Sequence, residues 1–123
     1  MSNYLNSFKL NDHHALVTGA GRGLGEACAL ALSEAGAEIT LVARSSDQLE
    51  SVAKQIRDSG GQASVHPADL TKMEEIRKLE ELGPFTILVN NAGITRDGVL
   101  AKMLKGIITD DSAFTAGVCV SYR

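Results

Sequence analysis

The feature that most constrains this chain is a glycine-rich octapeptide, TGAGRGLG, at residues 18–25. A short apolar run at 15–18 leads into it, and apolar residues recur at helical spacing from Leu24 to Leu32. An apolar run that ends at glycine is typical of a strand buried on both faces, whereas the later spacing predicts a helix. The octapeptide therefore predicts a tight turn between a buried strand and a helix.

The same alternation continues along the chain. We expect strands at 15–18, 39–42, 63–66 and 86–89, with a helix between each pair. Ser45 with Gln48, and Thr71 with Glu74, have the spacing of capping boxes at helix starts, and Gly36 ends the first helix as a C-terminal cap would. Alternating strands and helices imply parallel strands with right-handed crossovers. We therefore predict an α/β fold: a partial Rossmann-type, doubly wound parallel sheet in the order 3-2-1-4, truncated after the fourth strand.

The position of the octapeptide predicts a site for an anion. A loop between a strand and a helix directs backbone N–H groups and the positive end of the helix dipole at one spot. Glycines let the backbone bend sharply and let a ligand approach without an intervening Cβ. The spacing lacks the Gly-Lys-Ser/Thr of P-loop NTPases. The alternative is a tight turn with no ligand, but four glycines in eight residues make that turn entropically costly, so phosphate or dinucleotide binding is favoured.

Two motifs of this chain resemble those of the short-chain dehydrogenases/reductases. Thr18, Gly19, Gly23 and Gly25 match the Thr-Gly-x-x-x-Gly-x-Gly fingerprint, and residues 90–93 match the Asn-Asn-Ala-Gly signature after the fourth strand. The resemblance covers residues 8–104 and is closest in kind to 3-oxoacyl-carrier-protein reductases and gluconate dehydrogenases. It implies an oxidoreductase that transfers hydride between a nicotinamide cofactor and a small-molecule carbonyl or alcohol.

The resemblance also implies which residues bind the cofactor. The glycines of the octapeptide would shape the pyrophosphate site, and residues 91–93 would line the adenosine-ribose side of the cleft. Asp69 would accept a hydrogen bond from the adenine amino group with Leu70 packed nearby; alternatively, Asp69 is a turn residue before a helix cap at Thr71. The expected cofactor-binding residues are Gly19, Gly21, Arg22, Gly23, Leu24, Gly25, Arg44, Asp69, Leu70, Asn91, Ala92 and Gly93.

The residues after the second strand favour NADP(H) over NAD(H). An acidic residue there would bind the adenosine 2′-hydroxyl and repel a 2′-phosphate, whereas this chain has no carboxylate between Ala43 and Asp47. Arg44 lies in this stretch, and Arg22 in the octapeptide could reach the same place. Guanidinium groups form charge-assisted hydrogen bonds with phosphate. We therefore expect both arginines to bind the 2′-phosphate, the alternative being two solvated surface charges.

No residue of this chain can be assigned a catalytic role. The family uses a Ser together with a Tyr that a Lys follows four residues later, and neither Tyr4 nor Tyr122 begins such a motif. We therefore expect a dinucleotide-binding half at 1–105 with an atypical tail at 106–123, inactive by itself. The alternatives are a non-catalytic dinucleotide-binding module and an inactive truncated product.

Composition and charge argue against other kinds of partner. Twelve Lys and Arg against fifteen Asp and Glu give a net charge of -3 without a basic run, so we expect no nucleic-acid partner. No apolar stretch approaches the roughly 20 residues of a membrane span, and no Cys or His cluster has metal-ligand spacing. Two cysteines suit a reducing cytoplasm. The outer edge of the fourth strand has no partner strand in this prediction. We expect either that it pairs with a second copy of the chain in a homo-oligomer or that a substitute strand at 114–122 covers it.

Overall fold

Four parallel strands form one sheet in the structure, a computed structural model that describes residues 9–83 and 85–90. The strands are β1 (His14–Thr18), β2 (Glu38–Ala43), β3 (Ala63–Pro67) and β4 (Ile87–Asn90). Their order in the sheet is β3-β2-β1-β4, which confirms the predicted order 3-2-1-4.

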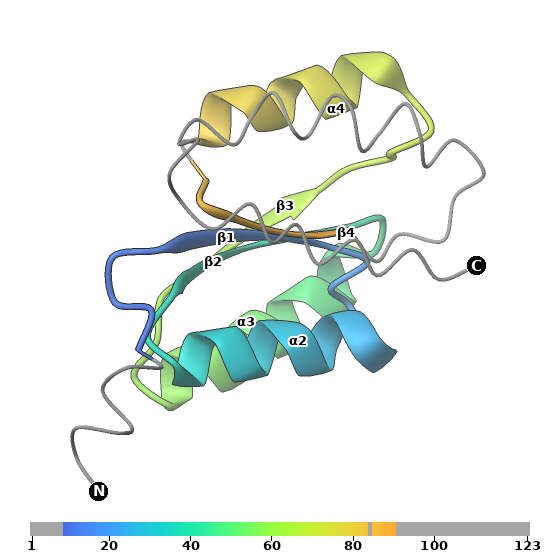
Figure 1. The fold of residues 1–123 in the computed structure, drawn as a ribbon. Helices are drawn as coiled ribbons and strands as arrows, with labels where there is room; N and C mark the ends of the chain where they lie inside the picture. The colour runs from blue at the N-terminus through green and yellow to red at the C-terminus, as the bar shows by residue number, and fades with distance from the viewer. Residues whose placement is uncertain (1–8, 84, 91–123) are drawn as a thin grey trace, which may run out of the picture.

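Helices cover both faces of this sheet (Figure 1). One face carries α2 (Gly23–Glu34) and α3 (Ser46–Asp58), and the other carries α4 (Met73–Leu79), which the 3-10 turn η1 (Glu80–Leu82) follows. None of the helices within the described ranges has the length and apolar character that a membrane crossing requires.

The alternation of side chains along the strands divides the core into two layers. Ala15 and Val17 of β1 pack toward α2 and α3, whereas Leu16 between them packs toward α4. The neighbouring strands follow the same pattern, because Ala15 pairs with Ile39 of β2 and with Ile87 of β4. Helices therefore bury both faces of the sheet, which explains why the central strands are continuous apolar runs.

The predicted end of the first helix at Gly36 and the predicted start of the second at Ser45 are confirmed. Ser45 caps α3, since its Oγ accepts a hydrogen bond from the N–H of Gln48 over 3.3 Å. The buried residues of α3 recur at helical spacing, and they are Leu49, Val52, Ala53 and Ile56. Glycines with positive φ follow both helices, Gly36 at 105° after α2 and Gly60 at 88° after α3.

The start of α4 differs from the predicted Thr71–Glu74 capping box. The N–H and the hydroxyl of Thr71 both donate to Oδ1 of Asp69, over 3.0 and 2.6 Å. Glu75, and not Glu74, reaches back over the turn to accept from the N–H of Asp69 over 3.1 Å. An aspartate two residues ahead of a threonine forms an Asx-type turn, which competes with the helix cap for the hydroxyl. The capping-box prediction was therefore wrong, and α4 begins at Met73.

Several predictions concern parts of the chain outside the described residues. These are the signature residues 91–93, the tail at 106–123 and the substitute strand at 114–122. The division into units 1–105 and 106–123 and the use of the β4 edge for self-association therefore stay predictions.

Candidate functional site

The turn between β1 and α2 depends on glycine at two positions. Gly19 has a φ of 63° and Gly23 a φ of 60°, both in the left-handed region that L side chains rarely adopt. A Cβ at Gly23 would meet nothing within 4 Å, so the backbone conformation and not crowding requires glycine there. The octapeptide is therefore the tight strand-to-helix turn that the sequence predicts, with open space beside Gly23.

The first turn of α2 is not capped by its own N-cap residue. Arg22 occupies that position in an extended conformation and makes no side-chain capping hydrogen bond. The first N–H groups of any helix have no acceptor within the helix, and the N–H of Glu26 is the one that bonds back to the carbonyl of Arg22, over 3.4 Å. The amides of residues 23–25 therefore have no acceptor within the helix and lie at the positive end of its dipole, an arrangement that favours an anion in general.

The beginning of the loop is anchored to the sheet. The N–H of Ala20 donates to the carbonyl of Val42 in β2 over 3.2 Å, and Ala20 is fully buried. Gly25 is also buried, whereas Leu24 is 46% exposed. The loop therefore has a fixed base and an exposed rim at the start of α2.

Both candidate arginines are exposed at this rim. Arg22 belongs to the loop after β1, and Arg44 follows β2 directly. These two strands are neighbours in the sheet, since Thr18 pairs with Val42 near their carboxyl ends. The structure thus brings the two arginine-bearing loops to the same edge of the sheet.

Asp69 lies after β3 at the same edge and is held by the turn before α4. Its pKa is lowered chiefly by the hydrogen bonds from the hydroxyl and the N–H of Thr71, and further by the positive charges of Arg44 and Lys72, while desolvation opposes them. The carboxylate is therefore ionised at neutral pH and can accept a hydrogen bond. Leu70 beside it is only 6% exposed and packs in the core layer under α4, so its side chain serves the fold.

The topology explains why these residues gather. The carboxyl ends of parallel strands lie at one edge, so the loop after β1, Arg44 after β2 and Asp69 after β3 share it. Sequence reasoning missed one contact of the loop: the side chain of Gln48 in α3 lies against Gly21, where a Cβ would be 2.8 Å from Gln48 Oε1. The signal in the sequence is the place of Gln48 in the α3 capping box, at the start of the helix after Arg44.

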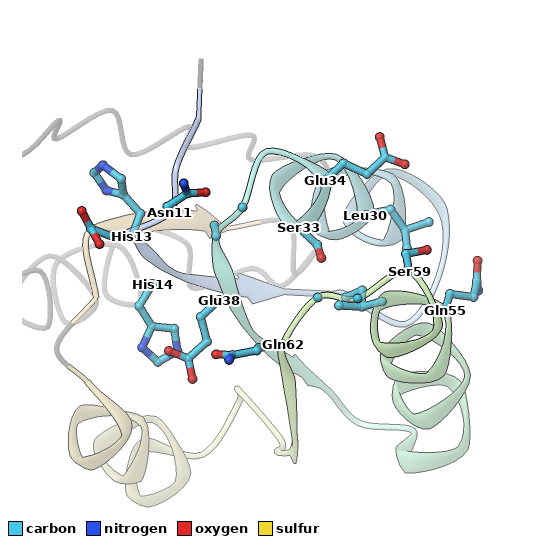
Figure 2. A pocket seen from close by; sticks show the side chains of 16 residues that line it. Asn11, His13, His14, Leu30, Ser33, Glu34, Glu38, Gln55, Ser59 and Gln62 are labelled. Atoms are coloured by element: carbon cyan, nitrogen blue, oxygen red, sulfur yellow. The ribbon is translucent and has the colours of Figure 1, made fainter. Parts of the chain in front are cut away.

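The opposite edge of the sheet holds a cavity of about 620 Å³ (Figure 2). Three chain segments, at 11–14, 36–38 and 59–62, contribute most of its lining. The C-terminal ends of α2 and α3 meet there, and helix C-termini carry partial negative charge. With Glu34 and Glu38 also in the lining, the cavity disfavours a phosphate, so the dinucleotide candidate is the glycine-loop edge.

The histidines near this cavity have structural partners. The Nδ1 atom of His13 lies 2.8 Å from the hydroxyl of Thr86, and Nε2 of His14 lies 2.7 Å from the hydroxyl of Thr40. Within the described ranges, no group of three His, Cys, Asp or Glu side chains could hold a metal ion.

Comparison with known proteins gives consistent matches. A family model described as short chain dehydrogenase matches residues 13–111. An uncharacterised oxidoreductase of Mycobacterium tuberculosis is 39% identical over 118 residues, which are 92% of this chain and 45% of that protein. A 3-oxoacyl-[acyl-carrier-protein] reductase of Staphylococcus epidermidis is 38% identical over 95 residues, 72% of this chain and 39% of that protein.

A solved structure agrees with these relatives. The crystal structure of a provisionally assigned NAD(P)-dependent gluconate 5-dehydrogenase from Beutenbergia cavernae, with NADP bound at low occupancy, is similar with a TM-score of 0.65 and 40% identity. The match covers 71% of this chain and 36% of that one. The chain thus spans less than half the length of each of these three proteins.

Proposed function

The chain belongs to the short-chain dehydrogenase family, and we propose that it supplies the NADP(H)-binding part of an oxidoreductase that interconverts a small carbonyl compound and its alcohol. The observation that carries this proposal is the first turn of α2. The side chain of its N-cap residue, Arg22, makes no capping hydrogen bond, and Gly19 and Gly23 beside it have left-handed φ angles. A phosphate is the ligand that such a turn favours, because it accepts several backbone hydrogen bonds at once. When bound, the nicotinamide would donate or accept the hydride.

The pyrophosphate would be held mainly by backbone. The amides of residues 23–25 would donate to its oxygens, and the absence of a Cβ at Gly23 lets the diphosphate approach closely. The anchored base of the loop at Ala20 supports this role, because a loop that is already ordered loses little conformational freedom on binding.

The preference for NADP(H) would come from charge. Arg22 and Arg44 stand on neighbouring loops at one edge of the sheet, where both could donate to a 2′-phosphate. Hydrogen bonds to a charged group contribute about 1.5–3 kcal/mol each, less where solvent screens them. The relative with NADP bound supports the same assignment.

Asp69 would accept a hydrogen bond from the adenine amino group, because its carboxylate is ionised and fixed in position by Thr71. Leu70 would contact the nucleotide through its backbone, since its side chain is buried in the core. Residues 91–93, which follow β4, remain proposed as the lining on the ribose side. We assign no catalytic residue. From the two cysteines we propose a reducing cytoplasmic location, and from the outer edge of β4 we propose self-association of the chain.

Binding to the purified chain tests the proposal. We expect NADP⁺ to raise the unfolding temperature more than NAD⁺ at the same concentration, because a ligand that binds only the folded state stabilises it by RT ln(1 + [L]/Kd), which is larger for the dinucleotide with the lower Kd. Equal shifts would contradict the roles of Arg22 and Arg44, and no shift with either dinucleotide would contradict the proposal as a whole. Because the chain contains no Tyr-x-x-x-Lys, we expect no carbonyl reduction in a parallel turnover assay.

A further inference from the structure

The strand β3 is an outer strand of the described sheet, where it pairs with β2 alone. At the beginning of this pairing, the N–H of Ile39 in β2 donates to the carbonyl of Gln62 over 3.0 Å. Successive residues of a parallel strand direct their backbone groups alternately toward one neighbouring strand and toward the other side. The backbone groups of Ala63 and Val65 are therefore the ones that face outward from the sheet.

Outward-facing backbone groups on an outer strand are a hazard for the folded chain. A row of N–H and C=O groups without a partner strand is a template on which a strand of another molecule can pair. Charged side chains and proline at such an edge oppose this pairing, because one hinders the approach of a second strand and the other lacks a donor. The outer side of β3 carries both kinds of protection.

The side chain of Arg57, near the end of α3, covers the first outward carbonyl. Its Nη2 donates to the carbonyl oxygen of Ala63 over 2.7 Å. Its Nη1 lies 3.9 Å from Oε2 of Glu50, two turns earlier on α3, and the Arg57 side chain is 52% exposed. A strand that approaches this edge would have to displace a charge-assisted hydrogen bond and approach a positive charge at the surface.

The other end of the strand is protected by Pro67. This residue pairs with Ala43 of β2 and is the last residue of β3. The alternation that turns Ala63 and Val65 outward also places position 67 on the outer side, where a proline has no N–H to donate. Between these two ends, Val65 keeps both an outward N–H and an outward carbonyl without a hydrogen-bond partner among the described residues.

We propose that Arg57 protects the outer edge of β3 and prevents a second copy of the chain from pairing with it. The hydrogen bond to Ala63 occupies the acceptor that the incoming strand needs, and the guanidinium charges of two copies repel each other at the same place. This role is independent of the proposed function, because it involves the end of α3 and not the glycine loop.

Sedimentation velocity of the full chain over a range of concentrations tests this role. We expect Arg57→Ala to raise the association constant between copies about tenfold, because the carbonyl of Ala63 becomes available and the charge is lost. Two controls should associate as the wild type does. Glu50→Gln removes the ion pair but keeps the hydrogen bond to Ala63, and Ser45→Ala destabilises the same helix from its other end.

A second change identifies the surface that pairs. Val65→Pro removes an outward N–H without removing a bond to β2, so in the Arg57→Ala background it should return the association constant to the wild-type value. Association through any other surface would survive this change.

Hydrogen exchange gives a readout that needs no second substitution. In Arg57→Ala, the amides of Ala63 and Val65 should become more protected as the protein concentration rises, whereas in the wild type they should exchange at the same rate at every concentration. If Arg57→Ala associates no more than Ser45→Ala, or if it associates while these two amides stay unprotected, the role of Arg57 is overturned.

Discussion

Two helices begin at the same edge of the sheet, each shortly after a parallel strand, and their first turns are built differently (Figure 1). Ser45 caps α3 with its hydroxyl. The N-cap residue of α2, Arg22, makes no side-chain capping hydrogen bond. Gly19 before the helix and Gly23 at its first position both have left-handed φ angles. A helix that has only to be stable takes a capping side chain. The comparison teaches that the uncapped turn, which gives up this stability, is the one to which the proposed function assigns the diphosphate.

The largest effect is expected at the glycine that opens α2. Gly23→Ala places a side chain in a left-handed backbone, which costs about 1–2 kcal/mol, and puts a methyl group where the diphosphate would approach. We expect lower stability in urea together with loss of NADP⁺ binding. Gly60→Ala is the control, because Gly60 also has a positive φ and open space around it but lies after α3, at the other edge. If both variants bind NADP⁺ equally, the turn is not a ligand site.

The second experiment makes the first turn of α2 resemble that of α3. Arg22→Asp supplies a capping carboxylate, which should stabilise the chain by about 0.5–1 kcal/mol. The same carboxylate would occupy the amides that the phosphate needs, so NADP⁺ binding should be lost as stability rises. Arg22→Ala separates the two effects, since it removes the guanidinium without adding a cap and should weaken binding without stabilising the fold. Retention of full NADP⁺ affinity by Arg22→Asp would show that these amides do not bind the cofactor.

The reverse change is made at α3. Ser45→Ala removes the cap and should lower the free energy of unfolding by about 1 kcal/mol, measured by urea denaturation. Ser46→Ala, at the first residue of the helix, is a nearby control that leaves the cap in place and should change stability by less than about half as much. Equal losses in the two variants would mean that the Ser45 hydroxyl is not the stabilising group.

The smallest effect concerns the turn before α4, a third helix start at this edge. Folding lowers the pKa of Asp69, so its contribution to stability is present above the ordinary pKa of an aspartate and is lost as the pH falls through the lowered value. Asp69→Asn should therefore be less stable than the wild type at pH 7, and the difference should shrink toward pH 3. A difference that stays constant over this range would contradict the role assigned to the charge.

Much of the fold could be predicted from local pattern. The four apolar runs and Gly36 indicated the strands and the end of the first helix, and the doubly wound arrangement with right-handed crossovers then predicted the strand order that the structure has. The start of α4 could not be predicted in the same way. Thr71 fits a capping box in the sequence, but its hydroxyl donates to Asp69 instead. Whether Asp69 is in reach depends on the turn at 69–75, in which Glu75 accepts from the N–H of Asp69.

Local pattern also predicted the backbone of the candidate site but not its tertiary contacts. The glycine spacing predicts where the backbone must bend, and the left-handed φ angles of Gly19 and Gly23 agree with that prediction. The contact between Gly21 and Gln48 joins residues far apart in the sequence, through two different helix starts, and no local spacing reports it. The burial of Leu70 is also a tertiary property, since it depends on where α4 packs.

The adjacent histidines at the start of β1 have a consequence for how the strands align. His13 bonds to Thr86 beside β4, whereas His14 bonds to Thr40 of β2 and packs against the ring of Phe85, with the ring centroids 4.5 Å apart and the planes tilted by 54°. Parallel strands have no hairpin to set their alignment, and a slip of one residue exchanges the two faces of a strand. Here such a slip would break both histidine bonds at once. The pair therefore favours one alignment of β1 against both of its neighbours, β2 and β4.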